Sequence, residues 1–204
     1  MKTTRTYTMS ARAEAVENTR RRILDALFTL AGERMFPEIS LEDVAREAGV
    51  SVQTVLRQFG SRAALIEANI EDANARVAEE RQTPVGDVDR AMTVIVDHYE
   101  LRGHTALLML AQEKSDPHVG TITERGRRMH RQWVDEVFAP YHSSSEAVID
   151  LLVVATDVYT WKLLRLDRGL SRSVTERRMK ALVRAILDDP ENGPENGPEK
   201  GTVQ

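Results

Sequence analysis

The sequence predicts an all-α protein with an N-terminal domain of short helices and a C-terminal helical domain. Apolar residues recur at steps of three and four along almost the whole chain to about residue 187, which places them on one face of successive helices. A serine stands three residues before an acidic residue at Ser40, Ser143 and Ser173, a pattern typical of helix N-termini. Both observations favour helices and neither favours strands.

Composition narrows the class of protein. The chain has 204 residues, enough for one or two domains with a sizeable core. It has no cysteine, which excludes disulfides and thiolate zinc sites, and its five histidines show no metal-ligand spacing, so neither a metal nor a cofactor is expected. Because apolar runs are short and a signal-peptide stretch is missing, we expect a cytoplasmic protein without a membrane partner.

The net charge of −4 is unevenly distributed. Residues 1–65 carry ten Lys and Arg against eight Asp and Glu, whereas the remainder carries 18 against 24. The N-terminal part is therefore the one suited to an acidic partner. Residues 1–9 lack periodicity and predict a flexible arm. A helix follows from about Ser10 to Arg34, and its Arg20–Arg22 cluster is a candidate for phosphate contacts.

Residues 40–59 predict two short helices joined by a tight turn. Ser40 and Ser51 are N-caps, and Gly49 stands where the first helix must end in a left-handed conformation. Each helix has one apolar stripe, formed by Leu41, Val44, Ala45 and Ala48 in the first and by Val52, Val55, Leu56 and Phe59 in the second. This combination is typical of a helix-turn-helix.

The outward face of the second helix carries side chains that suit a DNA groove. Amides pair with adenine edges, a guanidinium pairs with guanine or phosphate, and hydroxyls serve either. The alternative is an ordinary helical hairpin with a polar surface. The predicted DNA-binding residues, within a domain of residues 10–61 and the start of a connecting helix over 62–80, are Ser40, Ser51, Val52, Gln53, Thr54, Arg57, Gln58 and Arg62.

Residues 81–188 predict a second helical domain, which begins at a break containing Pro84 and Gly86. We expect helices over 88–102, ended by Gly103, then over 105–112 and 119–138. Apolar walls with a few polar groups are typical of ligand pockets, and the candidates here are His98, Tyr99, Met109, His130 and Trp133. The alternative is that these residues are core stripes and hydrogen-bonded histidines.

Residues 147–166 are apolar on nearly every side, so a helix over this range needs cover all round. Together with the last helix they suggest a four-helix bundle with a second copy of the chain, unless both helices pack inside a monomer. The predicted dimer interface comprises Leu152, Ala155, Tyr159, Leu163, Leu166, Leu182 and Ile186. Residues 189–204 repeat ENGP and predict a disordered tail.

The run TRRRILDALFTLAGERMFPEISLEDVAREAGVSVQTVLRQFGSRAALIEA resembles the DNA-binding domain of the TetR family of transcriptional regulators over about residues 12–70. The similarity lies in ILDAL, VAREAGVS, the aromatic that closes the second helix and FGSRAAL. It implies a homodimer that binds a palindromic operator and a C-terminal domain whose small ligand lowers DNA affinity. The chain departs from the family at three places. Leu56 stands where a phosphate-contacting tyrosine is usual, and Arg57-Gln58 stands where a basic or aromatic pair is usual. Arg62 stands where lysine is usual.

Two hypotheses follow. The first is a TetR-type repressor, without enzymatic activity, that binds an operator as a homodimer and is released by an unknown small-molecule effector. The alternative is an all-helical ligand-binding protein or enzyme that does not bind DNA. The sequence has no GxSxG, phosphate loop, paired helical histidines or cysteine nucleophile, which argues against the enzyme.

Overall fold

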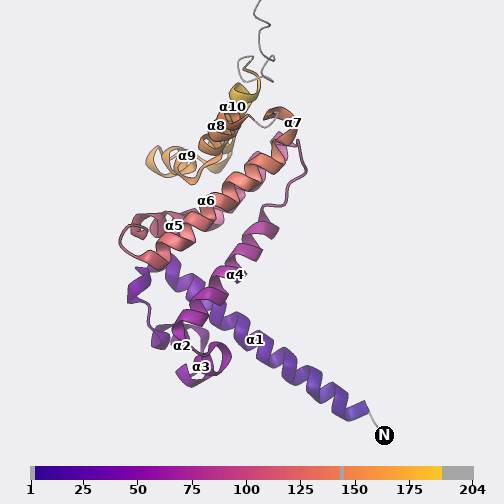
Figure 1. The fold of residues 1–204 in the computed structure, drawn as a ribbon, viewed down its shortest axis with the longest axis vertical. Coiled ribbons are helices and arrows are strands. Elements are labelled where there is room, and N and C mark those ends of the chain that lie inside the picture. The colour runs from indigo at the N-terminus through magenta and orange to yellow at the C-terminus, as the bar shows by residue number, and fades with distance from the viewer. Residues whose placement is uncertain (1–2, 143–144, 190–204) are drawn as a thin grey trace, which may run out of the picture. The chain divides into compact units, whose positions relative to one another are not determined.

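The computed structural model describes residues 3–142 and 145–189, and these residues form helices and turns with no strand among them (Figure 1). They belong to two compact units. Of the described residues, the first unit comprises those up to Ala78 and Leu108–Ile122, and the second comprises Glu79–Leu107 and those from Thr123 onward. Residues 108–122 thus group with the N-terminal unit, whereas the sequence analysis assigned them to the second domain. No described helix is long and apolar enough to cross a membrane.

The N-terminal unit is built on a long helix and a helix-turn-helix that packs against it (Figure 1). Its elements are α1 (Thr3–Glu33), a 3₁₀ turn (Phe36–Glu38), α2 (Leu41–Ala48), α3 (Val52–Phe59) and most of α4 (Arg62–Glu80). The first helix starts at Thr3, so residues 3–9, which the sequence analysis assigned to a flexible arm, are helical. Neither glycine nor proline interrupts the chain there, so the helix extends.

One apolar core holds this unit together. It contains Ile23 and Leu27 from α1, Val44 from α2 and Val55 from α3, all almost inaccessible to solvent. Burial of such side chains contributes about 1.5–3 kcal/mol each to stability. The stripes predicted for the helix-turn-helix therefore face the core except at Leu56, and the opposite side of α3 is left to solvent.

The second unit contains the larger part of α5 (Val88–Gln112) and α6 (Pro117–Val137), and all of the following helices. These are α7 (Ala139–His142), α8 (Glu146–Thr156), α9 (Val158–Lys162), a π-helical turn (Leu163–Asp167) and α10 (Arg172–Leu187). Large side chains of α5, α8, α9 and α10 are buried, among them Met92, Leu152, Trp161 and Met179, and so is Phe138 between α6 and α7.

The prediction that Gly103 ends a helix was wrong, because α5 runs through it from Val88 to Gln112. A Cβ atom at this position would lie 2.5 Å from Cζ3 of Trp161, much closer than atoms can approach. The glycine therefore makes room for the indole ring. The packing of Trp161, which is 1% exposed, offsets the helix penalty of glycine, about 1 kcal/mol.

The prediction of one helix over residues 147–166 was also wrong. The backbone leaves the helical region at Asp157, with ψ of 154°, and a new helix begins at Val158. The Asp157 side chain accepts a hydrogen bond from the N–H of Tyr159 at 2.8 Å, so it serves as an N-cap. Aspartate favours such caps over helix interiors because its carboxylate competes for backbone donors. The chain then forms the π-helical turn from Leu163.

The three predicted capping boxes have different outcomes. At Ser40 the box is confirmed, since its Oγ accepts from the Asp43 N–H and the Asp43 carboxylate accepts from the Ser40 N–H, both at 3.1 Å. The cap of the last helix is Ser171 rather than Ser173, because α10 begins at Arg172 and the Ser171 Oγ accepts from the Val174 N–H. Ser143 lies outside the described residues.

Candidate nucleic-acid interface and effector site

The turn of the helix-turn-helix has the predicted geometry. Gly49 has a φ of +64°, a left-handed conformation that costs residues with a Cβ atom about 1–2 kcal/mol. The Val50 N–H then donates to the Ala45 carbonyl at 2.9 Å, which closes the end of α2. The Ser51 Oγ accepts from the Thr54 N–H at 3.2 Å and caps α3. These bonds fix the direction in which α3 leaves the turn.

The polar face of α3 is accessible. Gln53 and Arg57, one helical turn apart, are exposed, and Thr54 and Gln58 beside them are partly exposed. Val52 is also partly exposed, and Ser51 is exposed at the N-terminus. Leu56, which stands where the resemblance implied a tyrosine, is partly buried. The amides and the guanidinium therefore share one open surface, which is the arrangement that major-groove contacts require.

Ser40 has a structural task in addition to its predicted place in the interface. Its hydroxyl donates to Asp43 Oδ2 at 2.7 Å, so it is occupied within the protein. The hydrogen bonds from Ser40 and from Arg46 hold the pKa of the Asp43 carboxyl well below its usual range. The resulting carboxylate stabilises the first turn of α2.

Arg62 also makes internal contacts. Its Nη2 donates to the carbonyls of Ile39 at 3.1 Å and Phe36 at 3.3 Å. Its guanidinium carbon lies 5.8 Å from the centre of the Phe36 ring. The side chain thus fixes the turn that leads into α2. From the sequence, Arg62 was expected to contact DNA, and these internal contacts were not predicted.

Two members of the Arg20–Arg22 cluster bind the helix-turn-helix itself. The Arg20 guanidinium lies over the Phe59 ring, 4.5 Å from its centre. Arg22 Nη2 donates to the carbonyls of Ala48 and Gly49, where backbone acceptors are left over at the end of α2. Positive charge at a helix C-terminus is favourable. These arginines attach α1 to the turn of the motif and to the end of α3.

In the second unit, four of the five predicted ligand-binding residues lie in one buried cluster. The rings of His98 and Tyr99 are 5.5 Å apart, and those of His130 and Trp133 are stacked at 5.9 Å. All four are less than 9% exposed. Met109 does not join them, because it packs in the apolar core of the first unit.

Arg81, which the sequence analysis missed, connects the two ring pairs. Its guanidinium carbon lies 5.7 Å from the centre of the Tyr99 ring, and its Nη1 is 3.4 Å from Nδ1 of His130. Its backbone carbonyl accepts from Trp133 Nε1 at 3.0 Å. The one sequence signal was a basic residue at the end of a long helix, directly before the break. We call Arg81, His98, Tyr99, His130 and Trp133 the arginine cluster.

Burial sets the charges of the arginine cluster. It lowers the pKa of His98 to about 3, with the nearby Arg81 cation as the second cause, and the pKa of His130 falls to about 3 for the same reasons. Both imidazoles are therefore neutral at pH 7. Burial also raises the pKa of Tyr99 well above its usual value, so the phenol is protonated and donates to the Thr156 carbonyl at 3.0 Å.

The predicted dimer residues fall into two groups. Leu152 and Ala155 are 0% and 4% exposed, since they pack inside the second unit. In contrast, Tyr159 and Leu163 are each 55% exposed and Leu182 is 47% exposed, while Leu166 and Ile186 are partly exposed. A groove of about 300 Å³ runs between α8 and α10, lined mainly by Leu151, Val154, Ala155, Leu182, Ala185 and Ile186.

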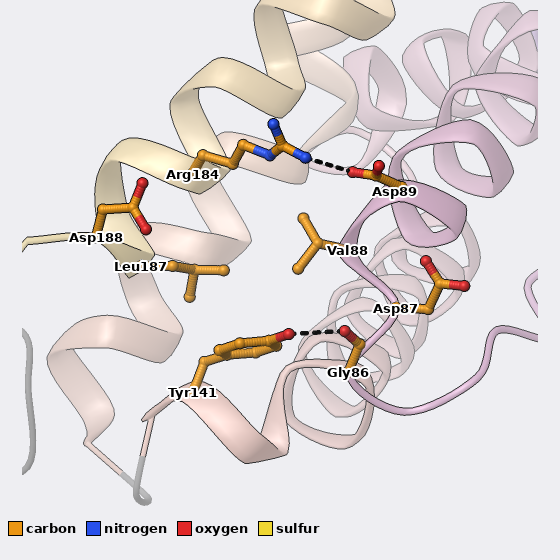
Figure 2. Close-up of a pocket in the computed structure, with 8 residues that line it drawn as sticks. All are labelled: Gly86, Asp87, Val88, Asp89, Tyr141, Arg184, Leu187 and Asp188. Atoms are coloured by element: carbon orange, nitrogen blue, oxygen red, sulfur yellow. Dashed lines mark hydrogen bonds and ion pairs between the residues drawn. The ribbon is translucent and has the colours of Figure 1, made fainter.

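A second hollow, of about 630 Å³, lies between the start of α5 and the end of α10 (Figure 2). Across it Arg184 Nη2 pairs with Asp89 at 2.9 Å, and the Tyr141 hydroxyl donates to the Gly86 carbonyl at 2.8 Å. Lys180 also pairs with Asp89. These bonds tie α10 to the start of α5. Among the residues that the structure describes, no group of three potential metal ligands comes together.

The N-terminal part of the chain is similar to a known protein family. Residues 23–68 match the family model described as "Bacterial regulatory proteins, tetR family". The match includes the turn at Gly49 and the whole of α3. The description is of regulatory proteins rather than enzymes, in agreement with the expectation that the chain is not an enzyme.

Solved structures of bacterial transcriptional regulators share the fold over most of the chain. A putative TetR-family regulator from Rhodococcus sp. is 18% identical with a TM-score of 0.62, covering 83% of this chain and 98% of its own. A transcriptional regulator from Rhodococcus sp. RHA1 is 20% identical with a TM-score of 0.60, covering 83% and 96%. A tetR-family regulator from Streptomyces coelicolor is 22% identical with a TM-score of 0.57, covering 87% and 92%.

Proposed function

We propose that this protein, a DNA-binding transcriptional regulator of the tetR family, is a repressor that binds a palindromic operator as a homodimer. A small-molecule effector that binds the arginine cluster releases it from DNA. The observation that carries the proposal is the exposed polar face of α3, with Gln53 and Arg57 one turn apart on a helix whose other face is in the core.

The DNA contacts fall into two kinds. Gln53 and Arg57 address base edges, where a bidentate contact contributes about 1–3 kcal/mol of discrimination. Ser51 and Thr54 lie at the N-terminus of α3, where backbone N–H groups and hydroxyls suit phosphate oxygens. Arg62 contributes by holding the 3₁₀ turn, so its effect on DNA binding is indirect.

The exposed apolar surface of α8 and α10 supports the homodimer. Leu151, Val154 and Leu182 border one groove and are 45%, 65% and 47% exposed. A contiguous apolar surface of this kind marks an interface, and a two-fold axis lets it cover itself. An interface of this class buries more than about 1,000 Å² in total. Dimerisation in turn brings two copies of α3 to half-sites about 34 Å apart.

The composition of the arginine cluster supports the effector site. It combines aromatic side chains with a few polar groups, the mixture of residues that small-molecule sites use. An effector that binds the cluster shifts the equilibrium between two conformers of the protein. The size of the shift is limited by the difference in the effector's affinity for the two conformers.

Selection from a random duplex library with the purified full-length chain tests the proposal. We expect enrichment of inverted repeats whose half-sites are spaced by one helical turn or a multiple of it. Gel shifts with the selected duplex in a salt series should show affinity that falls steeply with salt. A reporter gene behind that duplex should be expressed less when the protein is present. Absence of enrichment, or enrichment of single half-sites, would contradict the dimeric operator.

A further inference from the structure

Arg81 is the one member of the arginine cluster that carries a formal charge at pH 7, since both histidines are neutral. Burial lowers the pKa of its guanidinium, but arginine stays protonated in proteins. A cation in such surroundings loses hydration, and this loss must be offset by hydrogen bonds or opposite charge.

The neighbouring carboxylates are only partly available to it. Glu80 accepts from Arg102 Nε at 2.7 Å and lies 3.2 Å from His98 Nδ1. Asp157 caps α9, and it lies close enough to both Arg81 and Arg127 to feel their charge. Both carboxylates thus carry other contacts, and each influences Arg81 only through its charge.

The guanidinium also has an unused donor. Its Nε is buried and has no hydrogen-bond partner within the part of the chain that the structure describes. The opposite side of the group is engaged, with Nη1 directed to His130 and the plane near the Tyr99 ring. A buried donor left without an acceptor costs about 1–3 kcal/mol. A buried polar group without a partner in a folded protein therefore needs an explanation, such as a functional role or a bound water or ion.

We propose that the effector of the arginine cluster is a carboxylate, an aromatic or aliphatic organic acid whose oxygens accept from Nε and the adjacent Nη of Arg81. Arginine presents these two N–H groups in a fork that matches a carboxylate. The rings of Tyr99 and Trp133 pack against the apolar part of the acid. The neutral histidines supply N–H donors without adding charge. This inference rests on the proposed effector function of the cluster.

Thermal unfolding of the full-length protein with organic acids and their neutral amides tests the proposal. The probes are benzoate and octanoate against benzamide and octanamide, at millimolar concentration and constant ionic strength. We expect both acids to raise the Tm of the wild type by several degrees and the amides to leave it unchanged. Arg81→Met should abolish the rise, whereas Arg168→Met, at an exposed arginine, should retain it.

Without any probe, Arg81→Met should melt at the wild-type temperature or above it, because methionine removes an incompletely paired charge. Arg81→Lys keeps the charge without the fork, so it should retain only part of the acid-induced rise. A lowered Tm of Arg81→Met, equal shifts with acids and amides, or no shift with either acid would overturn the carboxylate proposal.

Gel shifts with the selected duplex separate this inference from the proposed function. Release of DNA by the amides but not by the acids would overturn the carboxylate proposal. It would still support the proposed function, a repressor controlled by an effector, with a neutral molecule as the ligand. Release of DNA by benzoate or octanoate from the wild type, but not from Arg81→Met, supports both the proposed function and the carboxylate proposal.

Discussion

The side-chain oxygen of Gln112, near the end of α5, accepts a hydrogen bond from the backbone N–H of Phe36 at 2.8 Å. Gln112 is 1% exposed, and its Nε2 donates to the Leu108 carbonyl at 2.9 Å, which fixes the amide orientation. On the other side of the same turn, Arg62 donates to the Phe36 carbonyl. The residues that lead into α2 are therefore held from two elements distant in sequence. This turn sets where the helix-turn-helix begins.

Replacing Gln112 by leucine removes the acceptor and leaves the Phe36 N–H buried without a partner. We expect Gln112→Leu to lower the free energy of unfolding by about 1–3 kcal/mol. Urea denaturation followed by circular dichroism measures it. Gln82→Leu, at an exposed position, is the control and should change stability by less than about 0.5 kcal/mol. Equal stabilities for the two variants would mean that the bond contributes nothing.

Alanine substitutions of Arg62 and Arg57 should differ in their effects on stability and on DNA recognition. Arg62→Ala loses hydrogen bonds to the Phe36 and Ile39 carbonyls, so it should lower stability by about 1–2 kcal/mol and weaken DNA binding as a consequence. Arg57→Ala should leave stability unchanged within about 0.5 kcal/mol and cost about 1–3 kcal/mol of discrimination at one base pair. Chemical denaturation and gel shifts with single-base variants of the duplex measure both effects. Unchanged stability of Arg62→Ala would disprove its structural role.

Gly49→Val tests the turn of the helix-turn-helix. Valine is strained at φ of +64°, by about 1–2 kcal/mol, and its Cβ would lie 2.9 Å from Nη2 of Arg22, which must move. We expect loss of operator affinity in a protein that still folds. Val85→Ala, at an exposed position in the second unit, serves as a control for the assay. Wild-type affinity of Gly49→Val would refute the need for a left-handed residue here.

The buried histidines predict a loss of stability in mild acid. The pKa values of His98 and His130 are about 3 in the folded protein and near the ordinary 6.5 in the unfolded chain. Below pH 6.5 the unfolded state therefore binds more protons, so stability falls as the pH drops from about 6.5 towards 3. By pH 5 each histidine should account for about 1–2 kcal/mol.

Urea denaturation between pH 5 and 7.5 measures this dependence, since most carboxylates stay ionised in that range. His98→Gln and His130→Gln should each flatten the profile, and His118→Gln, at an exposed position, should not. A profile for the double variant as steep as that of the wild type would show that other groups cause the acid sensitivity.

The helix-turn-helix could be predicted in detail because its determinants are local. Ser40, Gly49 and Ser51 act on their own turns, and all three adopt the predicted roles. The functions of Gly103 and Asp157 depend instead on distant or competing contacts. Gly103 accommodates Trp161, and Asp157 caps a new helix within an apolar run. Arg81 and Gln112 could not be identified because their partners are 18 to 76 residues away along the chain.

The proposed dimer rests on an excess of exposed apolar surface, and one exposed leucine tests it. Leu182 is 47% exposed on α10, so Leu182→Asp should leave the fold of the chain intact. In a dimer the same aspartate would be buried without a partner, which costs several kcal/mol, so the variant should dissociate and lose operator affinity. Leu101→Asp, at a leucine of α5 that is 70% exposed, should remain dimeric.

The mass of the wild-type protein in solution tests the central claim most directly, because operator binding by paired α3 helices requires two chains. Sedimentation equilibrium at micromolar concentration should give twice the chain mass of 23.0 kDa for the wild type and for Leu101→Asp. Leu182→Asp should give the mass of one chain. A single-chain mass for the wild type, at concentrations where it binds the selected duplex, would contradict the dimeric mechanism.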